Sequence, residues 1–210
     1  MPTTAVNPTR MELTRLKGRL RTAQRGHKLL KDKRDELMKR FMDVVREERE
    51  LRAKVEKSLE RAYGSFTVAS ALMSPEMLEQ ALLRPKQSVS LEMTSQNVMS
   101  VNVPRYEFKL KSAESGDVYP YGFAQTSGEL DDAVRELSEI LPELLRLAEA
   151  EKALAMLAAE IERTRRRVNA LEYVKMPEMQ RNIKYITMKL DENERANTIR
   201  LMKVKDMILK

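Results

Sequence analysis

Apolar residues recur at alternating steps of three and four along two long stretches of this chain, residues 10–62 and 143–208. An average period near 3.5 residues predicts two helices that pair as a left-handed coiled coil. A helix of the first length would extend about 80 Å and needs a partner along its apolar stripe. The predicted seam consists of Leu13, Leu16, Leu20, Leu30, Leu37, Phe41, Val44, Leu51, Leu154, Leu157, Ile161, Val168, Leu171, Ile183, Ile186 and Leu190.

The pattern of the second stretch slips by one position between Leu171 and Met176. Pro177 lies at the slip, and an internal proline removes a backbone hydrogen bond and clashes with the preceding turn. We therefore expect a kink or a break there. The alternative is a helix that ends at Met176 and restarts.

The first long helix has two candidate start signals. Asn7 precedes Pro8, which suits the first helical position, and Thr9 with Glu12 forms a rival capping box. Both predict a helix that starts near residue 8 or 9. The same helix is expected to fade around residues 63–65, where a glycine and a serine follow a tyrosine.

The segment between the long helices has a different pattern. Ser74 and Pro75 predict the start of a short helix. Alternating apolar residues from Val89 to Leu110 then predict a β-hairpin or a small three-stranded patch, with a turn at residues 95–97.

The predicted fold is therefore mainly α. A long antiparallel two-helix coiled coil is formed by the N- and C-terminal segments, and a small α+β insert with a β-hairpin lies at the turning end. The expected parts are residues 1–62, 63–128 and 129–210.

Composition supports a thin apolar seam instead of a globular interior. Charged residues are 34% of the chain, aromatic residues are 5%, and there is no Trp. The lack of Cys excludes disulfides and thiolate metal sites and fits a reducing compartment. Because no apolar run approaches about 18 residues and no secretory signal is present, we expect a soluble intracellular protein without direct membrane insertion.

The net charge of +7 is concentrated at the two ends of the chain. Residues 1–31 hold 8 basic and 1 acidic residue, residues 163–210 hold 13 and 6, and the remainder holds 18 and 25. If the long helices pair antiparallel, both basic ends meet in one positive tip. Such a tip is expected to meet acidic or anionic surroundings.

Motifs of common enzyme classes are missing from the sequence. There is no glycine-rich phosphate loop, HExxH, GxSxG or EF-hand pattern. His27 is the only histidine and lies on or beside the seam, where a hydrogen-bonded structural residue is expected more often than a metal ligand or a catalytic base. We therefore predict no catalytic, cofactor or metal site and a function that depends on shape and contacts.

Three sequence segments together resemble a known family. They are Val6–Leu13, Arg25–Leu37 and Arg166–Glu172, followed by Pro177 and the apolar residues after it. In this order they resemble the D subunit of the V/A-type rotary ATPases and ATP synthases. The resemblance covers nearly the whole chain, and its length is more typical of a bacterial or archaeal member than of a eukaryotic one.

The resemblance implies a central-stalk rotor without catalytic residues. In that family the coiled coil enters a hexamer of catalytic and regulatory subunits, which carries the nucleotide chemistry. The turning end joins the F subunit, a small stalk protein, and docks on a funnel-shaped subunit above the membrane ring. The location implied is cytoplasmic and peripheral to the membrane.

The resemblance leads to a specific hypothesis about the basic ends of the chain. Contacts between them and acidic positions of the hexamer would favour particular angular states; the alternative is that these charges only keep the protein in solution. The residues concerned are Arg10, Arg15, Lys17, Arg19, Arg21, Arg25, Arg163, Arg165, Arg166, Arg167, Lys203 and Lys205.

There are three alternatives to a V/A-type rotor. A nucleic-acid-binding coiled coil fits the isoelectric point near 9.5, but the sequence has no recognisable base-contact module. A generic scaffold or tether would dimerise through the same heptads. An F-type shaft would require a larger α/β domain between its helices.

Overall fold

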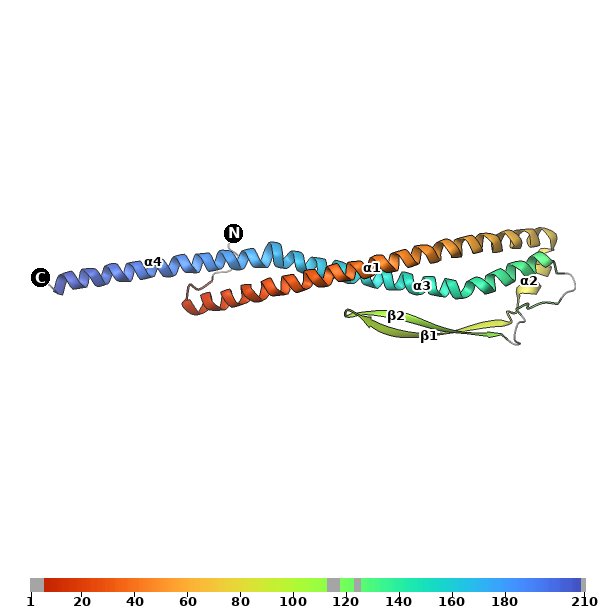
Figure 1. Cartoon of the computed structure of the whole chain (residues 1–210), viewed down its shortest axis with the longest axis horizontal. Coiled ribbons are helices and arrows are strands. Elements are labelled where there is room, and N and C mark those ends of the chain that lie inside the picture. Colours follow the sequence, from red (N-terminus) through yellow and green to blue (C-terminus); the bar gives the residue numbers. More distant parts are fainter. Residues whose placement is uncertain (1–5, 113–117, 123–125, 209–210) are drawn as a thin grey trace. The chain divides into compact units, whose positions relative to one another are not determined.

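The computed structural model describes residues 6–112, 118–122 and 126–208, with the backbone alone at 110–112. Two compact units are present: a terminal unit, formed by the chain up to Glu36 and from Ile161 onward, and a middle unit, Leu37–Glu160. Helices α1 and α3 contribute to both. The elements are α1 (Arg10–Leu72), α2 (Pro75–Leu82), β1 (Gln87–Val98), β2 (Val101–Ser112), α3 (Gly128–Asn169), the π-helix η1 (Ala170–Lys175) and α4 (Met176–Ile208) (Figure 1).

The terminal unit pairs the start of α1 with the end of α3, with η1 and with α4. Thr9 caps α1, because its Oγ1 accepts a hydrogen bond from the Glu12 N–H at 3.2 Å. The second of the two candidate start signals is therefore the one used. An ion pair of Arg10 with Glu194 and a contact of His27 with Glu172 show that the pairing is antiparallel.

A π-helical turn absorbs the slip in the apolar pattern. The Met176 N–H donates to the Leu171 carbonyl, five residues earlier, and helix continues directly into α4. A π turn holds one more residue than an α turn, which matches a slip of one position. The helix therefore neither breaks nor restarts at Met176, and Pro177 follows a widened turn.

In the middle unit, small residues lie between α1 and α3. Ala62, Ala69, Ala133, Ala150 and Ala153 are all buried. Small side chains at a helix contact allow a short interaxial distance. Arg52 of α1 and Glu151 of α3 form an ion pair at 2.5 Å, and further along α1 Ala69 packs with Leu130 near the start of α3, so this pairing is antiparallel as well.

The expected end of the first helix at residues 63–65 is wrong, because α1 continues to Leu72. The cost of a glycine in a helix, about 1 kcal/mol, is offset by apolar burial in the following turns. Ala69 and Leu130 are fully buried there, and Met73 is 8% exposed. The cluster comprises Ala69, Met73, Ala81 and Leu130, with Phe66, Met77, Leu78, Tyr121 and Val134 packed against it.

The predicted hairpin is present and has two strands of 12 residues each. The predicted turn at residues 95–97 is wrong, since Val98 pairs with Val101 and the turn is Met99-Ser100. Both turn residues have positive φ, 52° and 71°, as in a type I′ turn. The Asn97 side chain supports the turn by accepting from the Ser100 N–H at 3.1 Å and donating to Asn102 at 2.8 Å.

The hairpin lies along α3 within the middle unit (Figure 1). The Gln87 side chain bonds to Ser138 at 3.1 Å, and the Tyr106 N–H donates to Glu149 at 3.2 Å. Two strands alone are marginal in water, so contact with the helix stabilises them.

Candidate functional site

Positive charge is the main chemical feature of the terminal unit. Its two segments hold 23 basic and 11 acidic residues, a formal charge of +12, whereas the middle unit holds 16 and 21, a charge of −5. All basic residues proposed above for contacts with a hexamer belong to the terminal unit and are exposed. A charged surface of this kind attracts acidic partners over about 10 Å at ordinary ionic strength.

These basic residues do not gather at a single tip. The pairing of Arg10 with Glu194 places Lys203 and Lys205 beyond the first turn of α1. The contact of His27 with Glu172 places Arg165 about two turns further along the unit in the other direction. At 1.5 Å per residue, Arg165 and Lys205 lie about 60 Å apart along the helix. The expected compact tip is therefore replaced by a positive surface along the whole unit.

Some of the charge is neutralised within the chain. Arg10 pairs with Glu194, Arg166 with Glu162, and Arg15 with Glu12 at 3.5 Å. Exposed pairs of this type contribute about 0–1 kcal/mol. Arg163 also has an interaction within the chain. In the described parts of the chain, the other candidates form no ion pair. These are Lys17, Arg19, Arg21, Arg25, Arg165, Arg167, Lys203 and Lys205.

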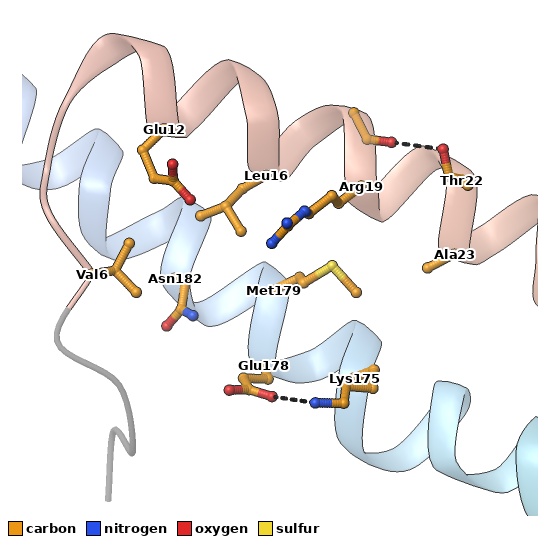
Figure 2. Close-up of a pocket in the computed structure, with 11 residues that line it drawn as sticks. Val6, Glu12, Leu16, Arg19, Thr22, Ala23, Lys175, Glu178, Met179 and Asn182 are labelled. Atoms are coloured by element: carbon orange, nitrogen blue, oxygen red, sulfur yellow. Dashed lines mark hydrogen bonds and ion pairs between the residues drawn. The ribbon is translucent and has the colours of Figure 1, made fainter.

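A groove of about 730 Å³ opens between the first turns of α1 and the start of α4. Figure 2 shows Arg19 and Met179 extending into the space between the two helices, while Val6 lies at its N-terminal end. Leu16 contributes to its apolar floor, and Lys175 pairs with Glu178 at 3.9 Å on its side. The groove is open and shallow, so it fits a side chain of a protein partner better than an enclosed small ligand.

His27 has a hydrogen-bond partner at the π-helical turn. Its Nε2 lies 3.2 Å from a Glu172 carboxylate oxygen, and its side chain is 20% exposed. This contact connects α1 to η1 where the seam changes register. Within residues 6–112, 118–122 and 126–208, no group of three or more His, Cys, Asp or Glu side chains is arranged to hold a metal ion.

None of the predicted seam residues is exposed. Leu16, Leu37, Leu157, Ile161, Val168 and Ile186 are buried, and the other members are half-buried. Thr164 is only 1% exposed but is absent from the predicted seam, because the seam was identified from apolar residues and threonine carries a hydroxyl. Its position, three residues after Ile161 and four before Val168, follows the seam spacing and could have identified it.

The last turns of α4 extend past the first residue of α1 and expose apolar side chains. Ile199 is 55% exposed, Leu201 70% and Met202 60%. Among the described helices, none has a stretch that is both long enough and apolar enough to cross a membrane. The apolar residues at this end are interspersed with Lys203 and Lys205.

Comparison with known proteins identifies the family to which this chain is similar. The chain matches the family of the ATP synthase D subunit over residues 12–206. It is 63% identical over 204 residues to the V-type ATP synthase D subunit of Acetivibrio thermocellus, covering 97% of this chain and 92% of that protein.

Two further relatives carry the same description. The V-type ATP synthase D subunit of Clostridioides difficile is 60% identical over 205 residues, covering 98% of this chain and 92% of the relative. That of Clostridium botulinum is 58% identical over 204 residues, covering 97% and 94%. The similarity therefore includes both helical segments and the insert between them.

Proposed function

Since the chain belongs to the family of ATP synthase D subunits, we propose that it transmits torque as the central-stalk subunit of a V-type rotary ATPase. Torque passes between ATP hydrolysis or synthesis in the catalytic hexamer and ion movement through the membrane ring. The family assignment favours this function over a scaffold, a tether or a nucleic-acid-binding coiled coil.

Antiparallel pairing of continuous helices supports the proposal most directly. Helix α1 has 63 residues without interruption, and helix runs without a gap from α3 through η1 into α4. In each unit these helices bury side chains against one another. Two interlocked helices resist twisting better than one, because close-packed side chains transmit strain.

The role of the chain in the complex is non-catalytic. It has no motif for nucleotide binding or hydrolysis, so the chemistry belongs to the hexamer. The chain acts through the angle at which its asymmetric surface meets each hexamer subunit, from a position peripheral to the membrane.

The terminal unit is the part placed inside the hexamer. Its charge of +12 complements acidic positions on the surrounding subunits. Arg165 and Arg167, both exposed, have no ion-pair partner in the described parts of the chain and are the best placed to favour particular angles.

The turning end of the middle unit is the part that meets the small stalk subunit and the funnel-shaped subunit that leads to the membrane ring. Leu72 is 68% exposed and Leu83 is 73% exposed around the short helix α2. Leu82 is also exposed there, and a group of exposed apolar residues, unlike single ones, is typical of a docking surface. The F subunit lies near the insert, and the funnel-shaped subunit docks on this end.

The function is tested by adding the chain to the isolated hexamer with a bead attached to Arg84, in the exposed loop after α2. We expect stable incorporation and one-directional rotation that depends on ATP. A chain that neither joins the hexamer nor turns would refute the shaft function.

The charge hypothesis is tested by replacing Arg165, Arg166 and Arg167 together with Gln. Hydrolysis should continue, while torque and ion pumping decrease because angular preference is lost. The matched control replaces three exposed basic residues of the middle unit, Arg46, Arg49 and Lys57, with Gln. Equal torque in both variants would leave these residues with a solubilising role only.

A further inference from the structure

Strand β1 presents an open edge in the middle unit. Ten of its twelve residues are exposed, with only Gln87 and Val98 half-buried. Strand β2 lies nearer to α3, where its Tyr106 N–H donates to Glu149. Around this contact the far edge of the hairpin is therefore the edge of β1, whereas at the start of β1 the Gln87 side chain bonds to Ser138 of α3.

The register determines which β1 amides point outward. In a two-residue hairpin the pair that closes the turn, Val98 and Val101, is hydrogen-bonded, and such pairs alternate along the strands. The amides of Val89, Leu91 and Met93 therefore point away from β2.

Two contacts agree with this assignment. The Thr94 hydroxyl donates to the Arg105 carbonyl at 3.3 Å, so that carbonyl faces β1. The Tyr106 N–H, one residue later, points away from β1 to Glu149.

The β1 edge lacks the features that usually prevent edge-to-edge pairing. Natural edge strands carry Lys, Pro or a bulge, or they are short. Here the register is continuous over twelve pairs, and Glu92 is the only charged residue of β1. By contrast, β2 has Pro104 at an outward-pointing position and is interspersed with charged residues.

An apolar row accompanies the open amides. Val89 is 38% exposed, Leu91 42% and Met93 71%. These side chains share one face of the hairpin, since residues two apart along a strand point the same way. An added strand would gain both backbone hydrogen bonds and apolar contacts.

We propose that the β1 edge accepts an extended strand from another subunit of the complex, an inference that rests on the proposed function. The strand has apolar residues at alternate positions and a Lys or Arg beside Glu92. Glu92 lies directly across from Glu107, and like charges in this position are destabilising. Lys109 is 3.9 Å from Glu92, but both side chains are about 70% exposed, so this pair compensates only weakly.

A second copy of the chain fits this edge poorly. Antiparallel self-pairing over residues 87–97, which uses the whole open edge, would place Glu92 of one copy directly opposite Glu92 of the other. Like charges at such short separation oppose pairing. The charge on β1 therefore selects a different, basic strand.

Hydrogen exchange tests the proposal at single residues. The chain would be exchanged alone and after assembly with the purified remainder of its complex, and then quenched for fragmentation mass spectrometry. We expect the Val89, Leu91 and Met93 amides to exchange roughly 100-fold more slowly in the assembly. The Ser90, Glu92 and Thr94 amides, which bond to β2, report hairpin stability in both samples.

A proline variant adds an independent test. Leu91→Pro removes one outward amide, and Pro104 shows that β2 accepts proline at such a position. Leu91→Thr is the matched control, because it shortens the side chain and keeps the amide. We expect Leu91→Pro to lose protection at Val89 and Met93 in the assembly, and Leu91→Thr to retain it.

The outcomes separate this inference from the shaft function. A chain that incorporates and rotates while its outward amides stay unprotected would overturn the strand proposal alone. Protection in the isolated chain together with dimerisation would show a second copy at the edge, which also overturns it. A chain that never incorporates would refute the shaft function itself.

Discussion

The two units hold a similar helix pair in different ways. In the described part of the terminal unit the helix pair forms nearly all of the structure, and few residues are buried, among them Leu16, Val168 and Ile186. In the middle unit, α2 and the hairpin lie beside the pair, and a cluster around Leu130 encloses its turning end. A two-helix seam leaves most of each helix exposed, so additional elements are needed to form an enclosed core.

The two units also differ in net charge. The terminal unit carries +12 and the middle unit −5. Repulsion among like charges destabilises a compact state, and an oppositely charged surround removes this cost. The comparison indicates that the middle unit is stabilised largely by its own core, whereas the terminal unit would gain more from the acidic partner proposed to surround it.

The largest expected effect is the loss of stability when a buried leucine is replaced, and it should differ between the two units. Leu130→Ala in the middle unit should lower the free energy of unfolding by about 4 kcal/mol, because Leu130 is fully buried and an enclosed cavity results. Leu16→Ala in the terminal unit should cost about 2 kcal/mol, because Leu16 lines the open groove and water can fill the space. Urea unfolding, with hydrogen exchange of peptides from each unit, measures both values.

Leu137→Ala is the control on α3, since Leu137 is 41% exposed. It should change stability by less than about 1 kcal/mol. Equal losses for Leu130→Ala and Leu16→Ala would show that the two units enclose their seams to the same extent, and the comparison would fail.

The second effect concerns the helix prolines of the two units. Pro142 lies inside α3 without a π turn, whereas Pro177 follows η1. Deletion of Val174, which is 56% exposed, removes the extra residue and places Pro177 in an ordinary α turn. The free energy of unfolding should fall by about 3 kcal/mol, because the proline ring then meets the preceding turn.

Addition of Pro177→Ala to the deletion should recover most of this loss, as measured by urea unfolding. Pro177→Ala alone in the full chain should change stability little, since the widened turn already accommodates the ring. A deletion variant as stable as the parent would mean that η1 does not serve to accommodate Pro177.

Much of the fold follows from sequence periodicity. The seam spacing predicts both helical stretches, and the slip before Pro177 coincides with η1. The end of α1 is not predicted correctly, because local propensity favours a helix end at Gly64. The helix continues because residues beyond Gly64 are buried near Leu130, and this burial depends on the tertiary fold. The hairpin turn was missed because Met99-Ser100 lacks the Asn or Gly that usually marks positive φ.

The candidate surface is predictable in part. The twelve candidate basic residues could be identified from the sequence, and all of them are exposed. Their distribution along the terminal unit could not, because it depends on the offset between α1 and α4 shown by the pair of Arg10 with Glu194. The open edge of β1 likewise required the register and the side of the hairpin that meets α3.

The smallest expected effect concerns Tyr121 in the middle unit. Tyr121 packs against the Leu130 cluster, and its hydroxyl donates to Asp131 at 2.9 Å. Tyr121→Phe should lower the free energy of unfolding by about 1 kcal/mol at pH 7 through loss of this hydrogen bond. Tyr63→Phe, at an exposed position of α1, is the control and should have no effect.

The pH dependence of this difference separates the hydrogen bond from packing. Burial, followed by the hydrogen bond to Asp131, raises the pKa of Tyr121 above its usual value. Because the unfolded chain loses this proton near pH 10 and the folded chain keeps it longer, the contribution is complete below pH 10 and decreases above it. The stability difference between the parent and Tyr121→Phe should therefore decrease from pH 10 to 11 in urea titrations, whereas a constant difference would show that the bond to Asp131 does not retain this proton in the folded chain.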